Sequence, residues 1–274
     1  MKDMSEPPFH GRVLIIAGSD SGGGAGIQAD IKTVTALGGY AASAITAVTV
    51  QNSLGVTGVH EIPAEIVAAQ ARAVLDDIGA DAIKTGMLGG AASVRAVAEV
   101  LAEWPDIPVV VDPVMIAKGG AALLSADAAQ VLRELILPRA ALLTPNAPEA
   151  TALTGVEVAD LDGQRRAGEA LLKLGAKAVL MKGGHVPGER VIDLLLTADG
   201  HTTFESPRLD TRHTHGTGCT LASACATGLA QGLPLTETVA RAWRYVHEAI
   251  IGAPGYGAGQ GPLDHGWPLR RAFR

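Results

Sequence analysis

The glycine-flanked segment 214–220, with the sequence Thr-His-Gly-Thr-Gly-Cys-Thr, holds the residues best suited to chemistry in this chain. It runs directly into the apolar stretch 221–229, which predicts a helix. Gly216 and Gly218 free the backbone to turn its N–H groups toward one point, and the positive end of the helix dipole lies behind them. The segment therefore predicts a phosphate-binding site at the start of a helix.

Cys219 falls in the first turn of this predicted helix. A helix N-terminus lowers the pKa of a thiol, so we predict that Cys219 is partly ionised near neutral pH and can accept a proton. A proton acceptor beside an anion cradle is what a kinase needs to move a phosphoryl group onto an alcohol. Taken alone, the segment is equally consistent with a tight turn that carries a small buried cysteine.

Three further polar clusters follow predicted strands. They are residues 112–114 (Asp-Pro-Val), 144–149 (Thr-Pro-Asn-Ala-Pro-Glu) and 181–185 (Met-Lys-Gly-Gly-His). In an open α/β sheet, ligands bind outside the carboxyl ends of the strands, so we expect these clusters to meet the phosphate site there. Asp112 and Glu149 offer oxygen ligands for Mg²⁺, and Lys182 offers a cation for phosphate oxygens.

Each of these residues also has a purely structural interpretation. Asn146 is a good helix N-cap, and Glu149 is a favourable charge in a first helical turn. Asp112 is a common turn residue, and Lys182 is a plausible solvated strand end. The functional prediction therefore rests on the joint placement of the residues at strand ends.

A second glycine-rich loop, residues 18–26, follows the first predicted strand and precedes a helix. Residues 24–29 match the dinucleotide-binding pattern G-x-G-x-x-A. A nicotinamide-dependent enzyme would place an acidic residue about 20 positions further on, where this chain has Gln51 and Asn52. An NAD-dependent oxidoreductase is therefore a minor alternative. No Gly-Lys-Ser/Thr triplet occurs in the sequence, so ATP would have to bind without a Walker A loop.

A zinc site is another alternative. His213, His215 and Cys219 have a suitable spacing, and His185 would provide a fourth ligand. No Cys-x-x-Cys or His-x-x-x-His pair supports this site, and the intervening glycines fit anion binding better. Cys225 lies in an alanine-rich helical pattern, and we interpret it as a core residue.

Short apolar runs alternate with longer helical patterns, which predicts a parallel sheet covered on both faces. The predicted strands are residues 13–17, 44–50, 82–85, 109–111, 141–144 and 179–182. The predicted helices are residues 25–37, 64–77, 91–103, 126–135, 148–153, 163–174, 220–231 and 235–251. Residues 190–196 and 201–205 predict an antiparallel hairpin around Asp199-Gly200. We expect one domain over residues 1–274, with irregular ends at 1–12 and 252–274.

Composition argues against several functional classes. The net charge of −6 argues against a nucleic-acid binder. No apolar run has the length of a membrane span, and residues 1–12 lack the apolar region of a secretory signal, so we expect no membrane partner. The two cysteines do not indicate a disulfide framework, so we expect a reducing, cytoplasmic location.

Taken together, these motifs resemble the hydroxymethylpyrimidine/phosphomethylpyrimidine kinases of thiamine biosynthesis, a branch of the ribokinase superfamily. The similarity covers nearly the whole chain and is carried by residues 17–30, Gln51, 84–88, 112–115, 144–146, 181–185 and 215–220. It implies a ribokinase-like three-layer αβα sandwich with a mostly parallel central sheet and an antiparallel edge hairpin. It also implies a homodimer that uses Mg²⁺ and ATP to phosphorylate an alcohol and then the resulting phosphate.

The resemblance also implies roles for single residues. Cys219 and Lys182 would be catalytic, and Gly216, Thr217 and Gly218 would form the anion hole. Asn146, Lys182, Thr217 and Gly218 would bind ATP phosphates, and Asp112 and Glu149 would hold Mg²⁺ directly or through water. The substrate ring would lie near Gly18, Ala25, Asp30, Gln51, Met87 and Val114.

The ring itself suggests how two of these residues act. A carboxamide such as that of Gln51 can pair with both the amino group and a ring nitrogen of an aminopyrimidine. A carboxylate only accepts hydrogen bonds, so Asp30 suits the amino group. The sequence departs from the family pattern at His213, where the resemblance leads us to expect Asn, and we expect any effect to fall on the second phosphorylation.

Two other functions stay open at this point. A vitamin B6 kinase also acts on a ring-borne hydroxymethyl group, although Gln51 and Met87 favour the pyrimidine. A non-catalytic sensor would bind the pyrimidine or its phosphate without turnover. The combination of Asp112, Lys182 and Cys219 argues against a sensor, because a binding protein has no need of both a base and a magnesium site.

Overall fold

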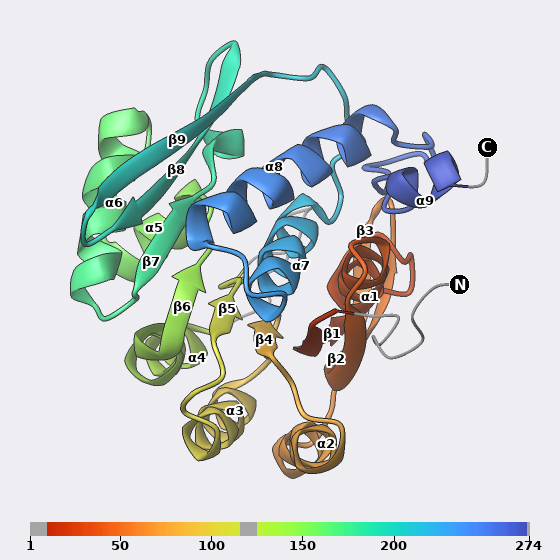
Figure 1. Ribbon diagram of the computed structural model, residues 1–274, viewed down its shortest axis with the longest axis vertical. Helices are drawn as coiled ribbons and strands as arrows, with labels where there is room; N and C mark the ends of the chain where they lie inside the picture. The colour runs from red at the N-terminus through yellow and green to blue at the C-terminus, as the bar shows by residue number, and fades with distance from the viewer. Residues whose placement is uncertain (1–9, 116–124, 273–274) are drawn as a thin grey trace, which may run out of the picture.

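The first strand, β1 (Arg12–Ser19), shows how the sequence builds the layers of the fold. Its side chains alternate between the two faces of the sheet, so Leu14 and Ile16 join one buried apolar cluster while Val13 and Ile15 join another. A strand that is apolar on both faces requires helices on both. The computed structural model, which describes residues 10–115 and 125–272, has this three-layer αβα arrangement (Figure 1).

The strands form one nine-stranded sheet in the order β3-β2-β1-β4-β5-β6-β7-β8-β9. Besides β1, they are β2 (Tyr40–Asn52), β3 (Gly55–Glu61), β4 (Ala82–Thr85), β5 (Val109–Val111), β6 (Ala140–Leu143), β7 (Ala178–Met181), β8 (Arg190–Thr197) and β9 (Gly200–Pro207). The six strands from β2 to β7 in this order are parallel, and β3, β8 and β9 are antiparallel to their neighbours. The expected mostly parallel sheet with an antiparallel edge hairpin, β8–β9, is confirmed.

Helices cover both faces of the sheet. One face carries α2 (Ala64–Asp77), α3 (Ala91–Glu103), α4 (Ala126–Val131), α5 (Ala147–Thr154) and α6 (Leu161–Lys173). The other face carries α1 (Gly26–Ala36), α7 (Thr217–Ala230) and α8 (Leu235–Ile251) (Figure 1). Among residues 10–115 and 125–272, no helix combines the length and the apolar character needed to cross a membrane.

The structure corrects the sequence-based elements in a few places. β3 was not predicted, because its glycines and polar residues interrupt the two valines and leave no apolar run, and most of its residues are exposed. The predicted helix 126–135 changes after Val131 into a π-helical turn, Leu132–Ile136. The expected irregular ends are also too long, since β1 begins at Arg12 and a short helix, α9 (Trp267–Ala272), forms near the end. Residues 1–9 of the expected irregular start lie outside the described residues.

Two glycine-rich loops meet where α7 begins. Gly216 precedes α7 and has a φ of +84°, a conformation that L side chains rarely adopt. A Cβ atom on Gly216 would lie 1.7 Å from the carbonyl oxygen of Gly24 in the loop after β1. Glycine is therefore required at position 216 for the backbones of the two loops to touch.

We predict that Gly216→Ala destabilises the protein more than Gly232→Ala, by about 1–3 kcal/mol in the free energy of unfolding. Gly232 is the matched control, since its φ is +76° but a Cβ atom there would meet no other atom within 4 Å. Both variants carry the backbone strain, and only Gly216→Ala adds the clash with Gly24. Urea unfolding of both variants measures the difference, and equal losses would contradict the prediction.

Candidate active site

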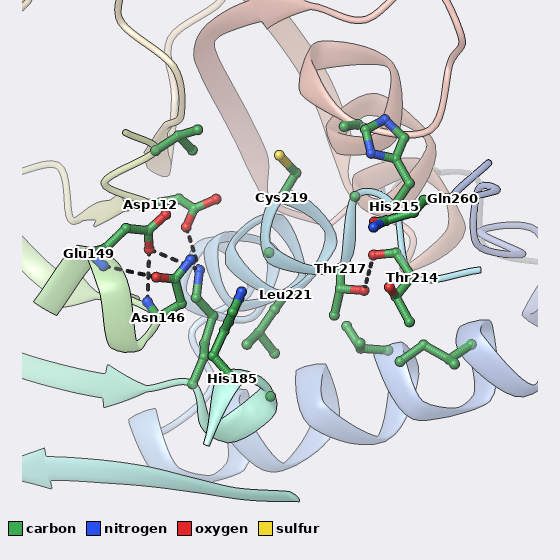
Figure 2. Close-up of a pocket in the computed structure, with 18 of the residues that line it drawn as sticks. Asp112, Asn146, Glu149, His185, Thr214, His215, Thr217, Cys219, Leu221 and Gln260 are labelled. Atoms are coloured by element: carbon green, nitrogen blue, oxygen red, sulfur yellow. Dashed lines mark hydrogen bonds and ion pairs between the residues drawn. The ribbon is translucent and has the colours of Figure 1, made fainter. Parts of the chain in front are cut away.

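A cavity of about 700 Å³ opens at the carboxyl ends of the central strands (Figure 2). Parallel strands bring the loops after β1, β4, β5, β6 and β7 to this one edge of the sheet, and α7 begins beside them. Nearly all of the residues expected at the site line the cavity. They are Gly18, Ala25, Gln51, Met87, Asp112, Val114, Asn146, Glu149, Lys182, Gly216, Thr217, Gly218 and Cys219.

A charged cluster occupies one part of the cavity wall. The Lys182 ammonium donates a hydrogen bond of 2.8 Å to Asp112 Oδ1 and lies 3.6 Å from Glu149 Oε2. Burial disfavours the charge on Lys182, but the two carboxylates outweigh this effect and raise its pKa. Burial also raises the pKa of Glu149 to about 7, against the opposing effect of Lys182. The interpretation of Lys182 as a solvated strand end is therefore wrong.

Helix α5 holds one carboxylate of this cluster in place through a capping box. The Asn146 side chain accepts a hydrogen bond of 2.9 Å from the backbone N–H of Glu149. In return, Glu149 Oε2 accepts one of 2.8 Å from the backbone N–H of Asn146. The interpretation of Asn146 as an N-cap is therefore confirmed, and the same cap brings both residues to the cavity wall.

The first turn of α7 packs against the Lys182–Asp112 pair. A Cβ atom on Gly218 would lie 3.1 Å from Lys182 Nζ and 3.5 Å from Asp112 Oδ2. Thr217 closes the turn before it, since its hydroxyl donates a hydrogen bond of 2.7 Å to the carbonyl of Thr214. The first N–H groups of a helix have no partner within the helix. The lack of a side chain on Gly218 thus lets these N–H groups and the Lys182 ammonium approach the same anion.

The donors of this cluster fit a magnesium ion that is shared with a phosphate. Mg²⁺ in phosphate-transfer sites commonly takes one or two carboxylates and completes its shell with phosphate oxygens and water. Asp112 and Glu149 are both buried carboxylates that share the Lys182 ammonium. Among the described residues, no group of three His, Cys, Asp or Glu side chains gathers as a metal site. The zinc alternative with His185, His213, His215 and Cys219 therefore gains no support.

Cys219 lines the cavity, but its predicted ionisation is wrong. Burial raises the pKa of the Cys219 thiol to about 12, although the nearby Lys84 ammonium opposes this shift. The helix dipole does not compensate for the loss of hydration, so the thiol is protonated at neutral pH. Figure 2 shows the thiol at the start of α7, on the cavity wall between Asp112 and His215. The other cysteine, Cys225, is fully buried in the core, as predicted.

The expectation that Asp30 contacts the substrate ring is also corrected. Asp30 is fully buried on α1, and it is not among the residues that line the cavity. Both of its carboxylate oxygens accept hydrogen bonds from Lys84 Nζ, at 2.9 and 2.8 Å, and Oδ1 also accepts one of 2.7 Å from Ser223. Lys84 itself lines the cavity, so the lysine lies where the carboxylate was expected.

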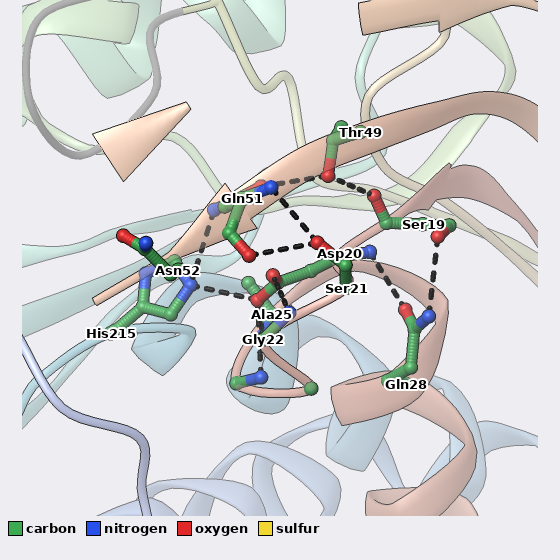
Figure 3. Close-up of polar contacts among 12 residues, drawn as sticks. Ser19, Asp20, Ser21, Gly22, Ala25, Gln28, Thr49, Gln51, Asn52 and His215 are labelled. Atoms are coloured by element: carbon green, nitrogen blue, oxygen red, sulfur yellow. Dashed lines mark hydrogen bonds and ion pairs between the residues drawn. The ribbon is translucent and has the colours of Figure 1, made fainter. Parts of the chain in front are cut away.

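The loop after β1 and the end of β2 form a polar network at the opposite part of the cavity (Figure 3). Gln51 Oε1 accepts a hydrogen bond of 3.2 Å from Thr49 Oγ1, and Gln51 Nε2 lies 3.3 Å from His215 Nε2. His215 Nε2 is also 2.8 Å from Asp20 Oδ2. Because His215 Nε2 donates its proton to Asp20, it has no lone pair for the Gln51 amide nitrogen, and the Gln51 amide is held through its oxygen by Thr49 at the cavity wall.

The Asp20 carboxylate connects this network to the glycine-rich loop after β1. Its carboxylate accepts hydrogen bonds from the backbone N–H groups of Gly22, Gly24 and Ala25. Burial raises the pKa of Asp20, but the hydrogen bonds from His215 and the backbone outweigh it, so the net shift is downward. The Asp20 carboxylate therefore stays ionised and fixes the shape of the glycine-rich loop.

Sequence reasoning missed several residues of the cavity wall. The sequence could have indicated Lys84 as a site residue, because it is the one charged residue within the otherwise uncharged strand β4. Nothing in the sequence indicated Asp193 as a site residue. Asp193 lies on β8, and its carboxylate accepts a hydrogen bond of 2.7 Å from the backbone N–H of Gly183, next to Lys182. Burial raises the pKa of Asp193 to about 6. His213, the departure from the family pattern, does not line the cavity.

A further wall of the cavity is largely apolar and comes from α7 and α8. Leu221, Val246 and Ile250 line it, together with Trp243 and His247. The rings of Trp243 and His247 are stacked, with centroids 5.7 Å apart and an angle of 5° between the planes. The cavity thus combines a charged cluster with a flat, apolar surface on one side and a polar network on the other.

The chain is similar in sequence to proteins named as hydroxymethylpyrimidine/phosphomethylpyrimidine kinases and to one named as a bifunctional protein of thiamine biosynthesis. The family model described as phosphomethylpyrimidine kinase matches residues 20–264. A hydroxymethylpyrimidine/phosphomethylpyrimidine kinase of Streptomyces coelicolor is 53% identical over 263 residues, which are 96% of this chain and 96% of that protein. The thiamine biosynthesis bifunctional protein ThiED of Geobacter sulfurreducens is 52% identical over 94% of this chain. The chain spans only 53% of the length of the Geobacter protein.

Solved structures with the same fold include enzymes of two related activities. Pyridoxal kinase of Bacillus subtilis, in an ADP complex, superposes with a TM-score of 0.88 at 36% identity, over 95% of this chain and 99% of that one. Phosphomethylpyrimidine kinase of Clostridium difficile 630 superposes with a TM-score of 0.78 at 42% identity, over 87% of this chain and 99% of that one. The expected ribokinase-like fold is confirmed. By sequence and by fold, the chain belongs to the phosphomethylpyrimidine kinase family.

Proposed function

We propose that this protein phosphorylates 4-amino-5-hydroxymethyl-2-methylpyrimidine to its monophosphate and then to its diphosphate, with ATP as donor. The observation that carries this proposal is the cavity itself, which joins the Asp112–Lys182–Glu149 cluster to the network around Gln51. The first part suits a transferring phosphate, and the second suits a polar ring. The 53% identity to a kinase of this name supports the same substrate.

The residues of the charged cluster would handle the phosphate. The Lys182 ammonium and the N–H groups at the start of α7 would hold the transferring phosphoryl group. Asp112 and Glu149 would hold Mg²⁺, which supplies positive charge to the phosphate oxygens when it is bound. The apolar wall beside Trp243 would exclude water from the nucleotide side. Cys219, in the first turn of α7, would take the proton from the substrate hydroxyl after its thiol has lost its own proton.

The Gln51 network would select the ring. Thr49 contacts the Gln51 oxygen, and the amide still offers its N–H donors and an oxygen lone pair toward the cavity. An aminopyrimidine edge offers one donor and one acceptor, which match such an amide. Gly18, Ala25, Met87 and Val114 would pack around the ring, and they lie in the same cavity wall.

We predict that the purified protein converts the pyrimidine alcohol to the monophosphate and then to the diphosphate, and that chelation of divalent metal by EDTA stops both steps. Phosphorus NMR of the reaction distinguishes the two products. ATP that stays intact with the pyrimidine present would refute the proposal. A reaction that ends at the monophosphate would refute only the second transfer.

We predict that Gln51→Leu raises the KM for the pyrimidine on the order of 10- to 100-fold, because each unpaired polar group in the closed site costs about 1–3 kcal/mol. The KM for ATP should change little. Steady-state kinetics with Gln130→Leu as the control separates this effect from a general one, since Gln130 is exposed on α4. An unchanged kcat/KM for the pyrimidine would remove Gln51 from ring recognition.

A pyridoxal kinase activity is the second candidate, because several solved structures with this fold carry that name. Pyridoxal has a phenolic oxygen where the pyrimidine has an amino group, so it would satisfy the Gln51 amide less well. The same NMR assay with pyridoxal in place of the pyrimidine tests this candidate. A higher kcat/KM for pyridoxal than for the pyrimidine would make the vitamin B6 kinase the better description.

We also propose that the protein is a homodimer that pairs through the exposed face of β2, beside the edge strand β3. Val48 and Val50 alternate outward along β2 and are 46% and 63% exposed, so they leave an apolar strip open to a second copy. Light scattering should give twice the monomer mass, and Val48→Lys/Val50→Lys should give the monomer mass. Ile251→Lys on α8 is the control, since Ile251 is 58% exposed elsewhere. A wild-type monomer would refute the proposal.

A further inference from the structure

A buried ion pair lies beneath the catalytic cavity, and the residues assigned so far to phosphate transfer do not include it. Lys84 on β4 and Asp30 on α1 are both 0% exposed, and their side chains are joined by two hydrogen bonds of 2.9 and 2.8 Å. Two buried charges seldom add stability, because the cost of removing them from water offsets most of their attraction. The presence of this pair beneath the cavity therefore points to a function for the charge.

The pair is attached to the same face of α7 that carries Cys219. Ser223 follows Cys219 by four residues, so the two side chains share one face of the helix. Ser223 donates a hydrogen bond of 2.7 Å to Asp30 Oδ1, which brings the ion pair against this face. On α1, Gly26 precedes Asp30 by four residues, and its backbone N–H donates to the Cys219 sulfur. The two helices thus place Cys219 one turn from Asp30 and its partner Lys84.

The Lys84 ammonium has donor capacity that Asp30 does not use. An ammonium carries three N–H donors, and among the described residues Asp30 is the partner that accepts from it. Gly86 lies two residues further along the chain, and a Cβ atom there would be 2.9 Å from Lys84 Nζ. A side chain at Gly86 would therefore crowd the ammonium, and glycine lets Lys84 hold this position. Both Lys84 and Cys219 line the cavity at this place.

We propose that Lys84, held by Asp30, is a positioning residue that stabilises the thiolate of Cys219 as that group accepts the substrate proton. The inference rests on the proposed kinase function and adds a residue to it. Asp30 fixes the ammonium and keeps it charged. Its role is therefore to hold Lys84 rather than to bind the ring.

The charges around Cys219 agree with this assignment. Lys84 from β4 and Lys182 from the loop after β7 favour a negative charge on the sulfur. Asp30 on α1 and Asp112 after β5 oppose it. Among these four charges, Lys84 has the largest effect on the pKa of Cys219, and it acts against burial. The thiolate would therefore be much scarcer without Lys84.

With Lys84 and Cys219 in these roles, every proton and bond of the phosphoryl transfer is accounted for. Before it, the Cys219 thiol loses its proton to solvent beside the Lys84 ammonium. The hydroxyl proton of the substrate then moves to the Cys219 thiolate as the new O–P bond forms. The bond between the γ-phosphorus and the ADP oxygen breaks, and ADP keeps its electron pair. The products are the phosphate ester, ADP and the Cys219 thiol, while Lys84 keeps its proton throughout.

The test measures the reactivity of the thiol directly, without substrate or turnover. Iodoacetamide alkylates thiolates, so the rate of Cys219 modification between pH 7 and 9, read by peptide mass spectrometry, reports the thiolate fraction. We compare the wild type with Lys84→Met/Asp30→Asn, which removes the ion pair without leaving a buried unpaired charge. The control is Arg12→Met/Asp81→Asn. It removes an ion pair between the first residue of β1 and the residue before β4, at the amino ends of these parallel strands and away from the cavity.

We expect the Lys84→Met/Asp30→Asn variant to alkylate about tenfold more slowly at each pH, which corresponds to a rise of one pKa unit for Cys219. The control variant should match the wild type. Equal rates in the Lys84 variant and the wild type would overturn the proposal, whatever the kinase assay gives. Slower alkylation in a protein that does not phosphorylate the pyrimidine would support Lys84 and count against the proposed function alone.

A second comparison leaves Lys84 unchanged and covers the case in which the double variant does not fold. Cys219→Asp places a permanent anion beside the ammonium, and Cys219→Asn places a neutral group of similar size there. If Lys84 stabilises an anion at this position, the Asp variant melts at least as high as the Asn variant at pH 7.5. A clearly lower melting temperature for the Asp variant would overturn the proposal.

Discussion

The cost of burying positive charge shapes the edge of the sheet where the cavity opens. Lys84 is the second-last residue of β4 and Lys182 directly follows β7, and their side chains are 0% and 13% exposed. Each ammonium therefore needs a carboxylate, and in each case the carboxylate comes from another element of the fold. Asp30 reaches Lys84 from α1, and Asp112 reaches Lys182 from the loop after β5. Ion pairs thus hold α1 and the loop after β5 to one edge of the sheet.

Glycine allows the other elements to approach these charges. At Gly216 a side chain would collide with the backbone of Gly24, and at Gly218 it would crowd Lys182. Gly183 is equally constrained, since a Cβ atom there would lie 2.0 Å from the carbonyl oxygen of Ile192. The first turn of α7 can therefore lie directly on the charged cluster. The same close approach leaves the helix N–H groups open to a phosphate.

Burial explains why two predictions at the site were wrong, namely the ionisation of Cys219 and the contact of Asp30 with the ring. Cys219 stands at a helix N-terminus, which favours a thiolate, but desolvation dominates and its pKa rises to about 12. Asp30 has a side chain that suits an amino group, but it is enclosed beneath the cavity and pairs with Lys84. In the proposed mechanism, the buried Lys84 ammonium rather than the helix alone stabilises the Cys219 thiolate.

The sequence by itself determined the features that follow from short local patterns. The period of the apolar residues predicted the sheet strands from β1 to β9 apart from β3, and strand ends predicted that Asp112, Asn146 and Lys182 would share one edge. Those inferences hold because burial on two faces and the carboxyl edge of a parallel sheet follow from pattern alone. Only the tertiary structure decided that Asp30 serves Lys84, and that Asp193 and Trp243 reach the cavity. Desolvation and pairing depend on which segments meet in space, and residues more than fifty positions apart, such as Asp30 and Lys84, carry no local sign of their contact.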